Sequence, residues 1–223
     1  MTDLPTVVAI GASAGGLEAL QDFVKAIPND SGLAYVVIQH LSPDQPSLMD
    51  KLLSAHTPVP VSRIEDGAPI APDHIYIIPP GPFAEIEDGH FKLIEHPREE
   101  GVRTPIDRFF SSLAETLERR AFAIVLSGTG SDGTTGIRAI KSNGGIALVQ
   151  ESGSAKFPGM PDSAASTGLV DFSLRPQDMP RRILEIVRHR EQIEDDGGRE
   201  DLLEGVEGRL NEILDLLDTE NGA

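Results

Sequence analysis

The fold is decided by residues 7–20, VVAIGASAGGLEAL, where an apolar run gives way to very small residues and then to a helical pattern. The run TVVAI, which begins at Thr6, is apolar throughout, as expected for a strand buried on both faces. The segment GLEALQDFVKAI, which begins at Gly16, is typical of a helix. A strand that turns directly into a helix is the repeating unit of α/β proteins.

The same alternation continues along the chain. Further strands are expected over AYVVIQ, PVPVSRI, HIYIIP, AFAIVL, IALVQ and LVDFSL. Further helices are expected over QPSLMDKLLSAH, TPIDRFFSSLAETLERR and TTGIRAIKSNGG, with Pro105 in a first turn and Gly144 as a C-terminal cap. The predicted fold is therefore α/β, with a mostly parallel sheet flanked by helices.

One interval departs from this rhythm. FAEIEDGHFKLIEH, residues 83–96, contains two short strand-like pieces on either side of Asp88-Gly89. Asp-Gly is a favoured pair for a two-residue hairpin turn. We expect an antiparallel β-hairpin added to the parallel sheet.

We expect one domain over residues 1–190, followed by an acidic linker and a C-terminal amphipathic helix over residues 191–223. The DDGG at residues 195–198 marks the linker. Beyond it, apolar residues recur at helical spacing: Leu203, Val206, Leu210, Ile213 and Leu217. This helix, over residues 200–218, could pack on the domain, associate with a second copy or bind a partner.

The amino-acid composition and charge disfavour several classes of function. The formal charge of −17, from 36 acidic against 19 basic residues, disfavours binding to nucleic acid and insertion at anionic membranes. The chain has no cysteine, and its six histidines show no metal-ligand spacing, so we expect neither a metal nor another cofactor. The start, MTDLPTVVAI, does not resemble a signal peptide, and no apolar run approaches membrane-spanning length. We expect a cytoplasmic protein.

Polar residues with catalytic chemistry follow three of the predicted strands. Ser13 lies in the small-residue turn after TVVAI, His40 follows AYVVIQ, and Asp132 lies in the loop after AFAIVL. In open parallel sheets, ligands bind just beyond the carboxyl ends of the strands. We therefore expect the three side chains to share one site.

The turn around Ser13 has the form G-x-S-x-G, a nucleophile elbow that exposes a serine between strand and helix. A serine needs a base to take its proton, and the base must be held in the correct tautomer. His40 and Asp132 are the candidates for these two roles. The backbone N–H of Ala14 is the first candidate donor to an oxyanion, beside the N-terminus of the helix that starts near Gly16.

Other interpretations of the glycine-rich loops remain. GASAGG has the glycine spacing of a P-loop, but Leu17 stands where the phosphate-binding lysine should follow. Residues 128–133 form a G-x-G-x-x-G after a strand and before a helix, with Glu151 near the place of a ribose-binding acid. A nucleotide-binding module is therefore an alternative. Each of the three polar residues also has a simpler interpretation: Ser13 as a cap, His40 as a polar residue with a partner, and Asp132 as a turn residue before glycine.

Taken together, the motifs resemble the catalytic domain of the CheB-type protein-glutamate methylesterases of bacterial chemotaxis. The resemblance runs from about residue 7 to about residue 187. The motifs that carry it are IGASAGGLEAL, VVIQHL, EDGAPIAPDHIYIIPPG, RTPIDRFF, VLSGTGSDGTTGIRAIKSNGG and FPGMPDSAA.

The resemblance implies a doubly wound, Rossmann-like three-layer fold with a serine hydrolase triad. Carried over by motif, Ser13 is the nucleophile, His40 the general base and acid, and Asp132 the residue that orients His40. Thr129 stands where the family usually has a methionine whose backbone N–H helps to stabilise the oxyanion. The implied reaction is hydrolysis of methyl-esterified glutamate side chains on chemoreceptors, which releases methanol, together with deamidation of receptor glutamines.

The chain also departs from the family pattern. Typical members carry an N-terminal receiver domain, whereas the first predicted strand here begins at Thr6. We therefore expect no control by phosphorylation within this chain, and the substrate could be a methylated chemoreceptor or a related signalling protein. The alternative function is a nucleotide-binding or catalytically silent signalling module of the same fold.

Overall fold

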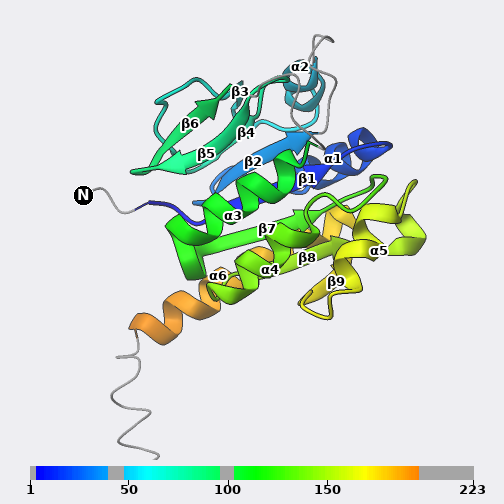
Figure 1. The fold of residues 1–223 in the computed structure, drawn as a ribbon. Helices are drawn as coiled ribbons and strands as arrows, with labels where there is room; N and C mark the ends of the chain where they lie inside the picture. The colour runs from blue at the N-terminus through cyan, green and yellow to red at the C-terminus, as the bar shows by residue number, and fades with distance from the viewer. Residues whose placement is uncertain (1–3, 40–47, 96–102, 196–223) are drawn as a thin grey trace, which may run out of the picture. The chain divides into compact units, whose positions relative to one another are not determined.

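The computed structural model describes residues 4–39, 48–95 and 103–195 (Figure 1). Two compact units make up the chain, Met1–Arg181 and Arg182–Ala223. The candidate site and the sheet that positions it belong to the first unit.

A seven-stranded sheet forms the centre of the first unit, in the order β3-β4-β2-β1-β7-β8-β9. Every neighbouring pair in it is parallel. Its strands are β1 (Val7–Ala12), β2 (Ala34–Gln39), β3 (Val61–Arg63), β4 (His74–Ile77), β7 (Ala121–Val125), β8 (Ile146–Gln150) and β9 (Phe172–Leu174). All seven strands predicted for the sheet are confirmed.

The first strand lies in the middle of the sheet. All six residues of β1 are buried, because neighbouring strands flank it and helices cover both faces. The chain first builds the sheet outward through β2, then returns to the other side of β1 with β7 and continues outward to β9. The predicted doubly wound fold is therefore confirmed, and the direction of winding changes between β1 and β7.

The helices lie between the strands as the sequence pattern predicts. They are α1 (Gly16–Lys25), α2 (Met49–Ser54), α3 (Pro105–Leu117), α4 (Thr134–Ser142), α5 (Gly159–Ala165) and α6 (Met179–Asp195), with short 3₁₀ turns at Glu118–Arg120, Ser152–Ser154 and Pro176–Asp178. Pro105 begins α3, and Gly144, with φ +79°, follows the end of α4. The helices α5 and α6 are additional to those predicted, since α5 is short and contains Gly159 and Pro161, and α6 is largely charged.

Alternate residues of the strands face opposite layers. Ala9 and Val36 belong to one apolar cluster with Phe110 of α3 and Ile137 of α4, and Figure 1 shows these two helices side by side on the near face of the sheet. Tyr35 points the other way, where its ring meets Phe23 of α1 at a centroid distance of 6.1 Å. These contacts give the three layers of the fold.

The predicted hairpin is confirmed, with β5 (Phe83–Glu87) antiparallel to β6 (His90–Ile94). Asp88 and Gly89 both have positive φ, 49° and 78°, as a type I′ turn requires. The hairpin forms a two-stranded sheet of its own and does not extend the parallel sheet. One reason is that α3 covers it: the Ile86 N–H donates to Ser112 Oγ at 2.8 Å.

The C-terminal predictions lie mostly beyond the described residues. The helix α6 continues to Asp195, past the predicted boundary at residue 190, while the predicted amphipathic helix over 200–218 lies outside the described part of the chain. Among the described residues, no helix combines the length and apolar character that crossing a membrane requires.

Phe110 is fully buried where α3 packs on α4 and the sheet. We expect Phe110→Ala to lower the free energy of unfolding by about 3 to 5 kcal/mol, because it removes apolar contacts and leaves a cavity. Urea denaturation followed by circular dichroism measures this change. Leu169→Ala, at a side chain that is 37% exposed, is the control, and an equal loss in both variants would contradict the packing described.

Candidate active site

The three strands that precede the predicted catalytic residues are neighbours in the sheet, in the order β2-β1-β7. In the register of the sheet, Gly11 of β1 pairs with Ile38 of β2 on one side and with Val125 of β7 on the other. All three strands therefore end at the same edge. This edge lies where the winding changes direction, which is the usual place for a ligand site in such sheets.

Ser13 lies directly after β1, half-buried, in a turn that only very small residues can form. Gly15 has φ +70°, a conformation that favours glycine, and a Cβ there would lie 3.0 Å from Ser127 Oγ. A Cβ on Gly16 would lie 2.7 Å from the Ala12 Cβ. The small residues thus allow α1 to start at Gly16, three residues after the serine, which is compatible with a nucleophile elbow.

The loop after β7 lies against this turn. The Ser13 N–H donates to the Ser127 carbonyl oxygen at 3.0 Å, and a Cβ on Gly128 would lie 3.0 Å from the Ser13 Cβ. The structure therefore brings two of the three predicted strand ends into direct contact.

The backbone N–H groups of Ala14 and Thr129, the predicted oxyanion donors, lie one in each of these two loops. Both residues are exposed. Within the described part of the chain, neither N–H donates to an acceptor. Backbone donors without an acceptor in the protein are available to stabilise an oxyanion.

Asp132 is 8% exposed, and α3 holds its carboxylate. The N–H groups of Ile106 and Asp107 donate to its two oxygens at 3.2 and 2.9 Å. Both donors are in the first turn of α3, where the helix dipole favours negative charge. A carboxylate anchored at this place suits the predicted role of orienting a histidine.

Asp107 completes a reciprocal arrangement that sequence reasoning missed. Its Oδ1 accepts a hydrogen bond from the Gly136 N–H at 2.8 Å, in the first turn of α4. Asp132, two residues before α4, caps α3, and Asp107, in the first turn of α3, caps α4. The available signal was an aspartate two residues after Pro105, a place where acidic residues stabilise a helix start.

His40 lies outside the described residues. The strand before it, β2, ends at Gln39, which pairs in register with Ala12 of β1. The assignment of His40 as the base remains a prediction that rests on the sequence.

The nucleotide alternative finds little support in the loop at residues 128–133. The Gly136 N–H in the first turn of α4 already donates to Asp107, and the Asp132 carboxylate, two residues before α4, would repel a phosphate there. Glu151, the candidate ribose ligand, accepts a hydrogen bond from Arg175 Nε at 2.8 Å. These contacts disfavour a pyrophosphate at this helix N-terminus.

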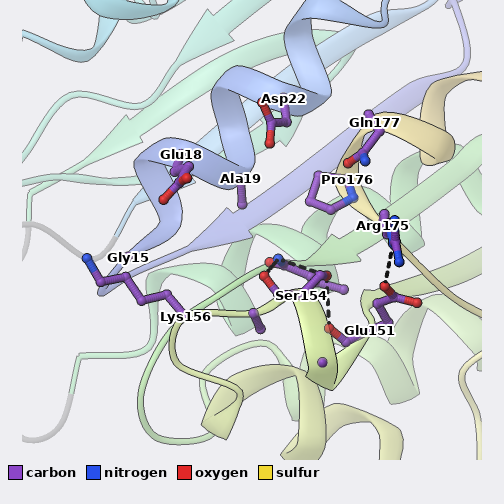
Figure 2. Close-up of a pocket in the computed structure, with 13 residues that line it drawn as sticks. Gly15, Glu18, Ala19, Asp22, Glu151, Ser154, Lys156, Arg175, Pro176 and Gln177 are labelled. Carbon is purple, nitrogen blue, oxygen red and sulfur yellow. Dashed lines mark hydrogen bonds and ion pairs between the residues drawn. The ribbon is translucent and has the colours of Figure 1, made fainter.

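A cavity of about 510 Å³ opens beside Gly15 (Figure 2). Glu18 and Asp22 of α1 line one side, and Glu151 and Arg175 lie across from them. The hydrogen bond and the charge of Glu151 raise the pKa of Arg175. Ser13 does not line this cavity, so the cavity lies beside the turn of the predicted nucleophile and does not include its side chain.

The described residues contain no group of three or more His, Asp or Glu side chains placed to hold a metal ion. The described residues of the candidate site are a serine on a tight turn, two unpaired backbone N–H donors and an anchored carboxylate. The fold and the site define a class of protein: a doubly wound α/β domain with a serine at the sheet edge where the direction of winding changes.

The chain belongs to the CheB methylesterase family, whose model matches residues 8–183. The crystal structure of the Thermotoga maritima CheB methylesterase catalytic domain is similar, with a TM-score of 0.75 and 27% identity over 82% of this chain and 100% of that one.

Curated relatives agree with this membership. A protein-glutamate methylesterase/protein-glutamine glutaminase 2 of Burkholderia lata is 34% identical over 76% of this chain and 50% of its own length. The protein of the same name from Methanospirillum hungatei is 31% identical over 83% of this chain and 53% of its own. An uncharacterized 104.1 kDa protein of Rhodobacter capsulatus is 44% identical over 56% of this chain and 13% of its own. The chain thus spans about half the length of the two named methylesterases.

The reciprocal caps predict a stability effect at Asp107. We expect Asp107→Ala to lower the free energy of unfolding by about 1 to 2 kcal/mol, because the buried start of α4 loses an acceptor. Asp107→Asn keeps a side-chain oxygen and should lose less. Urea denaturation measures both, with the exposed Glu115→Ala of the same helix as control. Equal stability of Asp107→Ala and Glu115→Ala would refute the capping role.

Proposed function

We propose that this protein is a protein-glutamate methylesterase that also deamidates glutamine side chains. The observation that carries the proposal is the contact between the Ser13 turn and the loop of residues 127–133, beside a carboxylate anchored at Asp132. Family membership and the names of the relatives from Burkholderia lata and Methanospirillum hungatei support it.

In the proposed reaction, Ser13 Oγ bonds to the carbonyl carbon of a glutamate methyl ester while His40 takes the serine proton. Asp132 holds His40 in the correct tautomer, and the N–H groups of Ala14 and Thr129 donate to the oxyanion. The bond to the methoxy oxygen then breaks, and methanol leaves with the proton from His40. Water hydrolyses the acyl-enzyme by the reverse proton path, which releases the glutamate and restores Ser13.

Deamidation of glutamine would use the same groups. The amide replaces the ester, ammonia leaves in place of methanol, and the acyl-enzyme is the same. Both substrates therefore need one serine, one base and one oxyanion site.

The proposed substrate is a methylated chemoreceptor or a related signalling protein, and the proposed location is the cytoplasm. The formal charge of −17 disfavours nucleic acid as a partner. The proposed domain organisation is a catalytic domain over residues 1–190 and an acidic linker with an amphipathic helix over residues 191–223.

Ser13→Ala should reduce methanol release from a methylated receptor fragment by roughly 10⁴-fold or more, because the nucleophile is lost. Gas chromatography of released methanol measures the rate. Ser163→Ala, at a half-buried serine of α5, is the matched control and should keep the wild-type rate. Near-normal turnover by Ser13→Ala would exclude the proposed mechanism.

The C-terminal segment gives a separate prediction, in which residues 200–218 associate with a second copy or with the receptor. A chain ended after residue 195 should hydrolyse a small methyl ester at the wild-type rate but lose this association. Sedimentation velocity and co-precipitation with the receptor fragment measure the two forms of association. Unchanged results in both experiments would reject a binding role for the segment.

A further inference from the structure

Ser127, the second residue after β7, is a buried serine whose backbone and side chain are all paired. It is 1% exposed. Its carbonyl oxygen accepts the Ser13 N–H at 3.0 Å, and its N–H donates to Gln150 Oε1 at 2.9 Å. Its hydroxyl donates to the Ala14 carbonyl oxygen at 3.0 Å and accepts the Phe157 N–H at 3.0 Å. The Phe157 carbonyl oxygen, at 3.5 Å, is a more distant acceptor for the same hydroxyl.

Two of these hydrogen bonds hold the turn that carries Ser13, one on each side of the peptide bond between Ser13 and Ala14. Ser127 binds the N–H of Ser13 and the carbonyl oxygen of Ala14. The carbonyl oxygen of Ser13 accepts the Gly16 N–H at 2.9 Å. Three of the four backbone polar groups of Ser13 and Ala14 are therefore paired. The fourth, the Ala14 N–H, has no acceptor within the described residues.

Ser127 is itself fixed by groups away from the turn. Gln150, at the end of β8, is 3% exposed, and its Nε2 donates to the Ser154 carbonyl oxygen at 3.0 Å. The side-chain amide of Gln150 thus joins the loop after β7 to the loop after β8. Because Ser127 is held from the sheet side, its two bonds to the turn define the position of that turn.

We propose that Ser127 is a positioning residue that orients the Ala14 N–H toward the oxyanion. The inference rests on the proposed esterase function and assigns Ser127 no contact with substrate. Donors that are already oriented before reaction stabilise the transition state most, because no reorganisation is needed when charge develops. Ser127 also lies directly before Gly128 and Thr129, so it links the loops that carry both proposed donors.

The first test compares the wild type with Ser127→Ala in methyl ester hydrolysis. Loss of the hydroxyl frees the Ala14 carbonyl, and we expect kcat to fall about 10- to 100-fold with KM nearly unchanged, less than the loss of a whole oxyanion donor. Ser163→Ala removes a serine hydroxyl that donates to Gly130 of the same loop at 3.1 Å, and it should leave kcat unchanged. Ser127→Thr, which retains a hydroxyl, should recover part of the loss.

The second test measures how fast a fluorophosphonate labels Ser13. In this reaction Ser13 Oγ bonds to phosphorus while the proposed base His40 takes the serine proton, fluoride leaves, and the phosphoryl oxygen occupies the oxyanion position. Ser127→Ala should label about 10-fold or more slowly at a temperature where thermal unfolding shows the variant to be fully folded. If Ser127→Ala does not fold, Ser127→Cys, with a weak S–H donor of similar size, takes its place with the same expectations.

The outcomes separate the two proposals. If the wild type neither hydrolyses the ester nor labels at Ser13, the proposed function fails. If the wild type does both and the folded Ser127 variant matches it in kcat and labelling rate, the positioning role alone is overturned. A kcat loss in Ser163→Ala equal to that in Ser127→Ala would also overturn it, because the effect would then belong to the loop in general.

Discussion

The close contact between the turn after β1 and the loop after β7 is the constraint on which the rest of the site depends. The hydrogen bond from the Ser13 N–H to the Ser127 carbonyl oxygen, at 3.0 Å, defines this contact. Gly128 allows it, since a Cβ there would lie 2.2 Å from Met160 Sδ as well as 3.0 Å from the Ser13 Cβ. The glycines near Ser13 therefore allow the loops after β1 and β7 to approach closely, in addition to allowing the tight turn after β1.

Hydrogen bonds to two carboxylates connect the starts of α3 and α4 beside the candidate site. Asp132, two residues before α4, accepts two N–H groups of α3, and Asp107 of α3 accepts one N–H group of α4. Burying a carboxylate without such donors would be costly. The same hydrogen bonds therefore stabilise the packing of α3 on α4 and fix the position of the Asp132 carboxylate.

Much of the fold could be predicted from the sequence because its signals are local. Apolar runs such as residues 7–10 and 121–126 mark strands, Pro105 and Gly144 mark helix ends, and Asp88-Gly89 marks a hairpin. The helix α5 was missed because Gly159 and Pro161 weaken its local pattern, although its residues pack on the loop after β7. The sequence predicts the hairpin, whereas its position as a separate sheet under α3 depends on a long-range contact.

The sequence by itself determined the strands, most of the helices and the candidates Ser13 and Asp132 at strand ends, because these follow from residue type and spacing. Only the tertiary structure decided that β7 returns beside β1, that Asp107 faces Asp132 across 25 residues, and that Ser127 pairs with Ala14 across 113. Such partners depend on the order of strands in the sheet. That order arises from packing over the whole domain, and no local pattern of residues contains it.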